Sequence, residues 1–179
     1  PGRASGVAFT RPLFYLGYTG VTTPENVSRF SSWESLDQPG VKVAVKQGSA
    51  IGDYVTRVFT KATIVSLAEP ALSAPLAAVP GQADVGLMNQ LTVFSYLRDN
   101  PQAGLKEILV DKPVEFTGVC WAVRPNDSRW LEFINTALKH YEDTRRIQEW
   151  ERKYGMPFMY HESRSFFYDS GKAAGTINW

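Results

Sequence analysis

A short turn at residues 47–50 carries the residue types best suited to holding a small anion. Gln47-Gly48-Ser49-Ala50 follows an alternating apolar stretch and precedes apolar residues at helical spacing, which predicts a strand, a tight turn and a helix. Gly48 lets the backbone approach a ligand closely, and the N–H groups at a helix start favour a carboxylate. The hydroxyl of Ser49 can cap the helix or donate to a ligand. The turn alone therefore leaves plain capping and ligand binding both open.

Asn89 is a second candidate, because it follows the apolar stretch Ala83–Met88 and precedes another helical pattern. It can cap that helix, or it can hydrogen-bond a ligand in the same cleft. In open α/β sheets, ligands bind beyond the carboxyl ends of the strands and against helix N-termini. We therefore expect Asn89 and the turn at 47–50 to lie at one edge of a sheet.

Residues suited to catalysis or to metal binding are sparse. Cys120 is the single cysteine and lies in an apolar run, which favours a buried structural thiol. Neither His140 nor His161 has partners at metal-ligand spacing, so both are expected to be solvated or to lie at the edge of a core. The sequence contains no phosphate-binding loop, dinucleotide fingerprint or serine elbow. We therefore expect no metal and no cofactor.

The composition is that of an ordinary globular domain. The chain has 179 residues, of which 44% are apolar and 21% charged, and this length allows a core without disulfides. Nineteen basic and eighteen acidic residues leave a net charge of +1, so we expect no nucleic-acid partner. No apolar run approaches the ~18 residues of a membrane helix. The start at Pro1 shows no secretory leader, so we expect a processed product or a piece of a longer protein.

Hydrophobic periodicity predicts alternating strands and helices with short connections. The expected elements are short extended pieces over 7–21 broken at Pro12 and Gly17, a loop at 22–32, a turn at 35–40, strands at 41–45, 62–67, 83–88, 105–110 and 114–123, and helices at 51–59, 69–79, 89–97, from Asp127 or Ser128 onward, and 144–153. The expected buried positions of the helices are Ile51, Tyr54, Val55, Val58, Phe59, Trp130, Ile134, Leu138, Tyr141, Ile147 and Trp150. This order predicts an α/β fold with a mainly parallel sheet flanked by helices.

Five blocks, taken in order, resemble the type II periplasmic solute-binding proteins, the extracellular family 3 class. They are Arg3–Leu13, Ser35–Ser49, Gly81–Asn89, Gly118–Asp127 and Leu131–Asn135. Each block is short, but their order and spacing are those of the family, and together they extend over about residues 3–155. The resemblance therefore concerns most of the chain.

The resemblance implies a protein that captures a small solute, an amino acid or a related carboxylate, in a cleft between two lobes for an ABC importer. Residues 1–15 would lead into the hinge, 16–125 would form the second lobe, 126–157 the C-terminal helices, and 158–179 a tail of unassigned structure. The first lobe is largely absent, so we expect an exposed apolar face and self-association through it. The membrane subunits of the importer would be the partners. The implied location is periplasmic or extracytoplasmic, with the signal peptide outside this chain.

The resemblance also assigns the ligand site. It places Gly48, Ser49 and Ala50 where the family holds a ligand carboxylate, and we expect Gln47 and Ile51 to belong to the same site. Asn89 stands where amino-acid binders usually have an aspartate for the ammonium group, and an asparagine supplies no ion pair. Ile51 replaces a frequently polar position. Both departures imply a less polar or a differently charged solute.

Two other functions share this fold. Residues 37–41 also resemble the cyclohexadienyl dehydratases, whose catalytic carboxylate follows the same turn. This chain has Ile51 there, which cannot move protons, and Asp53 lies two residues further along the helix. We therefore expect no catalysis. An extracytoplasmic sensor domain of a signalling protein fits the same residues as a transport component does.

Overall fold

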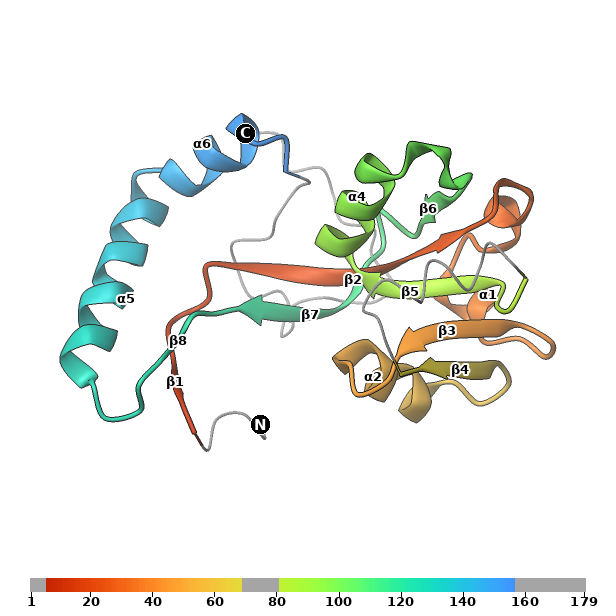
Figure 1. The fold of residues 1–179 in the computed structure, drawn as a ribbon, viewed down its shortest axis with the longest axis horizontal. Coiled ribbons are helices and arrows are strands. Elements are labelled where there is room, and N and C mark those ends of the chain that lie inside the picture. Colours follow the sequence, from red (N-terminus) through yellow and green to blue (C-terminus); the bar gives the residue numbers. More distant parts are fainter. Residues whose placement is uncertain (1–5, 69–80, 157–179) are drawn as a thin grey trace. The chain divides into compact units, whose positions relative to one another are not determined.

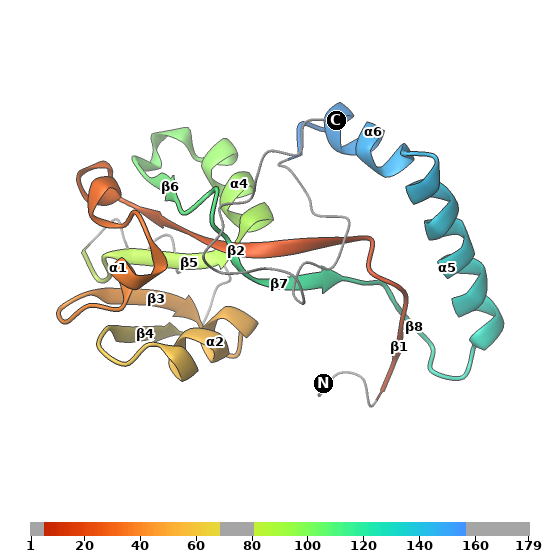
Figure 2. The same cartoon turned by 180° about the vertical axis from the view of Figure 1, so that it is seen from behind.

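The structure is a computed structural model that describes residues 6–68 and 81–156 (Figures 1 and 2). The chain divides into two compact units. One contains Pro1–Leu16 and Thr117–Arg164, and the other contains Gly17–Phe116 and Ser165–Trp179. The helix expected at 69–79 and the tail at 158–179 lie outside the described residues. The domain boundaries expected from the resemblance stay predictions.

The larger unit is built on one six-stranded sheet in the order β4-β3-β5-β2-β6, with β7 also pairing with β2. The strands are β2 (Phe14–Thr22), β3 (Lys42–Lys46), β4 (Thr63–Leu67), β5 (Val85–Asn89), β6 (Lys106–Ile108) and β7 (Val114–Val119). β3 runs parallel to β4 and β5, whereas β2 runs antiparallel to β5 and β6. The α/β class is confirmed, and the parallel part of the sheet is the group of strands around β3.

Helices cover both faces of this sheet. They are α1 (Trp33–Leu36), α2 (Ala50–Val58) and α4 (Gln90–Asp99), and the unit also has the short 3₁₀ helices η2 (Pro24–Arg29) and η3 (Pro101–Ala103). Val43 and Val45 of β3 pack in a cluster with Ile51 of α2, while the intervening Ala44 packs in a second cluster with Val93 of α4. Alternate residues of a strand point to opposite faces, so α2 and α4 lie on opposite sides. This arrangement fixes where both helices begin.

Several local expectations for the larger unit were wrong. β2 continues through Gly17, where Pro113 packs so closely that an added Cβ would lie 2.5 Å from the Cβ of Pro113. The glycine therefore allows close packing and does not break the strand. The loop at 22–32 contains η2, and the turn at 35–40 is preceded by α1, which a reciprocal cap between Ser32 and Ser35 starts. Val58 lies in the last turn of α2 and is exposed.

Two carboxylates hold the loops of this unit together. Asp84 accepts a hydrogen bond from the Lys42 backbone N–H at 2.8 Å and pairs with Arg29 at 3.1 Å, so it fixes the turn before β5. Asp37 binds the connection between α2 and β4. Desolvation of its carboxylate raises the pKa, but hydrogen bonds from the backbone N–H groups of residues 62, 61 and 60 outweigh it and lower the pKa to about 2.

The smaller unit consists of a ribbon and two helices. β1 (Ala8–Phe9) pairs antiparallel with β8 (Ala122–Val123), and α5 (Ser128–Asp143) and α6 (Arg146–Lys153) follow. Asp127 caps α5 by accepting a hydrogen bond from the Trp130 N–H at 3.1 Å, as expected. The helical residues buried as expected are Ile134, Leu138 and Ile147. The aromatic residues expected to be buried beside them are exposed, namely Trp130, Tyr141 and Trp150.

The burial of Trp130, Tyr141 and Trp150 was therefore wrongly predicted. In the part of this unit that the structure describes, β1 and β8 are two residues long each, and the three aromatic side chains stay 50%, 39% and 46% exposed. Helical periodicity identifies an apolar face, but it does not say whether the chain itself covers all of it.

Candidate functional site

The turn after β3 is accessible and has the backbone geometry that its sequence requires. Gln47, Gly48 and Ala50 are exposed. Gly48 has φ +68°, a left-handed conformation that favours glycine. The Gln47 N–H donates to the Leu67 carbonyl at 2.9 Å, which ties the turn to the end of β4. The turn therefore lies at the carboxyl edge of the parallel strands.

Ser49 is the N-cap of α2, as the sequence predicts. Its hydroxyl oxygen accepts from the Gly52 N–H at 3.2 Å, and the hydroxyl donates to the Lys46 carbonyl at 2.6 Å. The hydroxyl proton is thus already used within the turn, and Ser49 does not offer it to a ligand. The N–H groups of Gly48 and Ala50 have no acceptor among the described residues, so they are the donors that this turn presents to solvent.

Ile51 was expected at the ligand site, and its side chain lies elsewhere. It is 2% exposed and belongs to the core cluster on the α2 face of the sheet. The apolar spacing of α2 requires this, because Ile51 and Val55 are one turn apart on the same face. The side chain of Ile51 therefore packs into the core between the first turn of α2 and the sheet, and it cannot line an exposed site.

Asn89 caps α4 and is oriented by that role. Its side-chain Oδ1 accepts from the Thr92 backbone N–H at 2.9 Å and from the Thr92 hydroxyl at 3.0 Å. Because a backbone N–H must meet an oxygen, this contact fixes which end of the amide faces the helix. The Nδ2 group points to the other side and has no acceptor among the described residues. Asn89 therefore presents a donor and not an acceptor.

Strand pairing brings the two helix starts together. β3 and β5 are parallel, with Val43 opposite Val85 and Ala44 opposite Gly86. The same offset places Gln47 level with Asn89, at the ends of neighbouring strands about 5 Å apart. The edge where Asn89 and the turn at 47–50 meet is called the donor edge below. The juxtaposition expected from the sequence is confirmed by the pairing register.

Two further residues of this edge were not singled out from the sequence. Tyr18 of β2 lies opposite Asn89, and the buried Gln90 accepts from the Gly17 N–H at 3.1 Å through its Oε1. Gln90 thereby fixes β2 to the first turn of α4. Polar residues are common directly after an N-cap, so the sequence alone does not single out Gln90. The antiparallel pairing of β2 with β5 is what identifies both positions.

The donor edge carries little charge of its own. Gln47, Gly48, Ser49, Ala50 and Asn89 are all uncharged, and two helix N-termini contribute partial positive charge, while Asp53 in the first turn of α2 is an exposed carboxylate. On the outer part of α2, burial of the Tyr54 phenol raises its pKa, Glu115 raises it further and Arg57 lowers it, so this phenol stays protonated near neutral pH. The edge is therefore suited to acceptor groups and not to acid–base chemistry.

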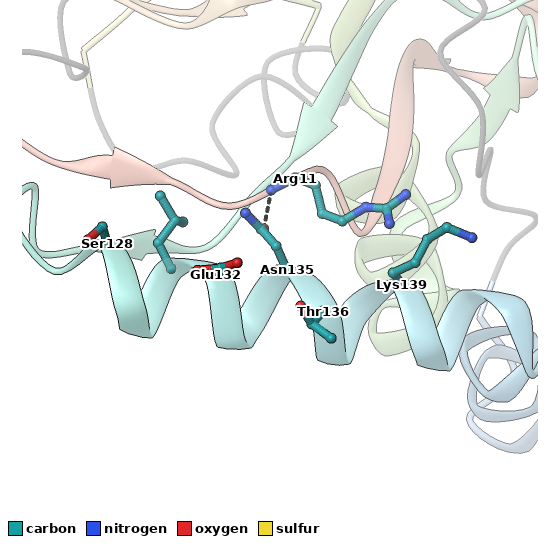
Figure 3. A pocket seen from close by; sticks show the side chains of 7 residues that line it. Arg11, Ser128, Glu132, Asn135, Thr136 and Lys139 are labelled. Atoms are coloured by element: carbon teal, nitrogen blue, oxygen red, sulfur yellow. Dashed lines mark hydrogen bonds between the residues drawn. The ribbon is translucent and has the colours of Figure 1, made fainter.

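A groove lies in the smaller unit. It has a volume of about 490 Å³ and is lined by Arg11 and by one side of α5 (Figure 3). The Arg11 N–H donates to Asn135 Oδ1 at 2.8 Å, while its guanidinium pairs with Glu142 at 2.6 Å. Lys139 pairs with Asp143. Both cations are thus neutralised by neighbours, and the groove is poorly suited to an anion.

Two negative findings concern the described residues 6–68 and 81–156. They contain no cluster of three histidine, cysteine or carboxylate side chains that could hold a metal ion. None of their helices is both long enough and apolar enough to cross a membrane. Cys120 is half-buried, which raises the pKa of its thiol by desolvation.

No protein-family model matches the sequence, and neither does any curated protein. Solved structures do match. A binding component of an ABC transporter from Wolinella succinogenes, complexed with lysine, is 18% identical with a TM-score of 0.70, and the match covers 90% of this chain and 66% of that one. An ancestral arginine-binding protein bound to arginine is 25% identical with a TM-score of 0.66, covering 85% and 66%.

A third match is an ancestral amino acid-binding protein described as a precursor of cyclohexadienyl dehydratase. It is 24% identical with a TM-score of 0.69, covering 86% of this chain and 63% of that one. The chain has the type II solute-binding fold. This solute-binding fold is the one that the resemblance predicted, and the chain spans 63–66% of the length of these three structures.

Most of the matching structures of this solute-binding fold are described as binding proteins and not as enzymes. Several are described in complex with an amino acid, lysine in one and arginine in two others. None of the five donor-edge residues carries a carboxylate.

Proposed function

We propose that this chain is the solute-binding part of an ABC importer's extracytoplasmic binding protein, and that it binds a small carboxylate-bearing solute at the donor edge without catalysis. The observation that carries the proposal is the meeting of two helix N-termini at the carboxyl ends of β3 and β5, on an exposed turn. The membrane subunits of the importer are the proposed protein partners.

The turn after β3 would hold the carboxylate. The N–H groups of Gly48 and Ala50 supply two donors on exposed residues, and the α2 macrodipole adds a favourable field. Ser49 and Gly52 keep these amides in place through the cap and do not contact the solute in this proposal. Charge-assisted hydrogen bonds from backbone amides to a carboxylate are each about 1.5–3 kcal/mol, enough for selective binding.

Asn89 would select the second polar group of the solute. Its Oδ1 is occupied by Thr92, so only the Nδ2 donor is left for a ligand. A carbonyl or a second carboxylate on the solute can accept a hydrogen bond from Nδ2. An α-ammonium group cannot, because it too has only hydrogen-bond donors. The proposed solute is therefore an acid whose polar atoms are acceptors, such as a 2-oxo acid, in preference to the corresponding α-amino acid.

An enzyme of the cyclohexadienyl dehydratase type is the second candidate, because one matching structure is described as a precursor of that enzyme. The position that resembles its catalytic carboxylate is Ile51, whose side chain is buried in the core. Asp53, in the same first turn of α2, is exposed. The proposal therefore expects no turnover of prephenate or arogenate, and measurable turnover would replace binding by catalysis as the function.

A charge placed at the turn tests the proposal. The variant Ala50→Glu puts a carboxylate at the first residue of α2, where the macrodipole tolerates it, so the fold is retained. Repulsion should weaken binding of a 2-oxo acid by roughly tenfold or more. Ala50→Gln has nearly the same shape without the charge and should weaken binding much less. Equal affinities of the two variants in titration calorimetry would contradict the placement.

A further inference from the structure

Tyr18 of β2 lies at the donor edge, and the proposed function gives it no role. It is the direct pairing partner of Asn89, because β2 runs antiparallel to β5 with Tyr18 opposite Asn89 (Figure 1). Side chains that lie directly opposite in an antiparallel pair point to the same face, with Cβ atoms about 4.5–5.5 Å apart. Tyr18 therefore stands beside the side chain of Asn89, on the face of the sheet that α2 covers.

The ring of Tyr18 is anchored, whereas its hydroxyl is available. The side chain is partly buried and packs against the core cluster that contains Val45 and Ile51. Among the residues that the structure describes, the phenol has no hydrogen-bond partner, and the buried side-chain atoms that lack a partner belong to other residues. The phenol oxygen is therefore open to solvent. An anchored ring with an unpaired hydroxyl can bind a ligand group without first being ordered.

The hydroxyl of Tyr18 adds a second donor to the one that Asn89 presents. A phenol donates a hydrogen bond more readily than it accepts one, because the lone pairs of its oxygen are delocalised into the ring. The Oδ1 of Asn89 is occupied by Thr92, so Asn89 offers its Nδ2 group. Neighbouring strands are about 5 Å apart, so two donors at this spacing suit a solute that carries two acceptors.

The charges near Tyr18 favour an uncharged second acceptor. Asp53 is an exposed carboxylate in the first turn of α2 and would repel another negative charge on the solute. Arg57, at the other end of α2, pairs with Glu115 at 3.4 Å, so its charge is already balanced. A carbonyl oxygen accepts from a phenol without adding charge, so it fits this position better than a second carboxylate.

We propose that Tyr18 is a specificity-determining residue of the donor edge, and that its hydroxyl donates to a carbonyl on the side chain of the bound 2-oxo acid. The inference rests on the proposed function, because the turn at 47–50 and Asn89 must hold the carboxylate and the 2-oxo group. It narrows the proposed solutes to 2-oxo acids that carry a second, uncharged carbonyl further along the chain.

Titration calorimetry with two matched acids tests this role. The acids are 2,5-dioxohexanoate and 2-oxohexanoate, which have the same chain length and differ only in the second carbonyl. The wild-type chain should bind the dioxo acid roughly three- to tenfold more tightly, as expected for one neutral hydrogen bond. Tyr18→Phe removes only the hydroxyl and should abolish this preference. Tyr15→Phe is the matched control and should retain it, because Tyr15 lies three residues earlier in β2 and points to the opposite face.

The outcomes separate this role from the proposed function. A wild-type chain that binds both acids equally overturns the role of Tyr18 and leaves the carboxylate site in place. A preference that survives in Tyr18→Phe, or one that Tyr15→Phe abolishes as well, also overturns it. A wild-type chain that binds neither acid overturns the proposed function and this inference with it. Thermal unfolding of each variant without ligand verifies that the fold is retained.

Discussion

Replacing Asn89 by aspartate should change which class of acid the chain binds. Aspartate is as good an N-cap as asparagine, so one carboxylate oxygen can accept from the Thr92 N–H and hydroxyl as Oδ1 does now. The second oxygen then occupies the place of Nδ2. The variant Asn89→Asp therefore converts a donor into a charged acceptor and leaves the fold in place, with about 0.3–1 kcal/mol gained from the α4 macrodipole.

The size of the effect follows from the exchanged group. An α-ammonium group that meets a carboxylate gains a charge-assisted hydrogen bond of about 1.5–3 kcal/mol, which is roughly a ten- to hundredfold gain in affinity. A 2-oxo acid loses the hydrogen bond from Nδ2 of Asn89, and the new carboxylate repels its negative charge. Its affinity should therefore fall by a similar factor. The preference between the two ligand classes should therefore shift by about two orders of magnitude or more.

Titration calorimetry with matched ligand pairs measures this shift. Each pair consists of an α-amino acid and the 2-oxo acid with the same side chain, so only the ammonium and the carbonyl differ. The wild-type chain should prefer the oxo acid and Asn89→Asp the amino acid. Asn89→Ala should bind both poorly and should lose about 1 kcal/mol of folding stability with the cap.

An unchanged preference in Asn89→Asp would refute the assignment of Asn89 to the site. A wild-type chain that prefers amino acids would instead refute the orientation of its amide, since only an exposed oxygen accepts from an ammonium group.

Two further predictions concern stability. Asp37 has a pKa lowered to about 2, so its contribution is fully present above the unfolded-state pKa near about 4 and is lost as the pH falls from there toward about 2. The free energy of unfolding, measured by chemical denaturation across this pH range, should fall more for the wild type than for Asp37→Ala. Parallel pH curves for the two proteins would contradict this prediction. Gly17→Ala should destabilise by about 1–3 kcal/mol, because the new Cβ would lie 2.5 Å from the Pro113 ring, and a neutral result would show that Pro113 can move.

Capping residues were the most predictable part of the structure. Ser49, Asn89 and Asp127 were each expected to begin a helix, and each accepts a hydrogen bond from the N–H three residues later. This works because an N-cap is a local contact between residues close in sequence. The parallel strands were predictable for a similar reason, since apolar stretches of five or six residues between helical patterns leave few other arrangements.

The details of the donor edge could not be obtained from the sequence. The side chain of Asn89 has an acceptor and a donor, and only its contact with Thr92 decides which one is left for a ligand. The hydroxyl of Ser49 is likewise taken up by the Lys46 carbonyl, which periodicity does not reveal. Ile51 shows a conflict within the sequence itself, because its helical spacing predicted the core while its family position suggested the cleft. The core position is the one observed.

The exposure of Trp130 and Tyr141 was missed for a different reason. Spacing correctly identified both as part of an apolar helix face, but burial requires a second layer, and the described residues of the smaller unit do not supply one for them. Apolar periodicity thus indicates which face of a helix needs cover, and the tertiary packing decides whether that face is covered.

The binding of a carboxylate at the donor edge is tested most directly by following backbone amides with NMR during titration with a 2-oxo acid. The amide signals of Gly48 and Ala50 and of the Asn89 side-chain amide should shift saturably, with little change along α5. Shifts confined to Arg11 and to the groove beside Asn135, with Gly48 and Ala50 unmoved at saturation, would contradict it.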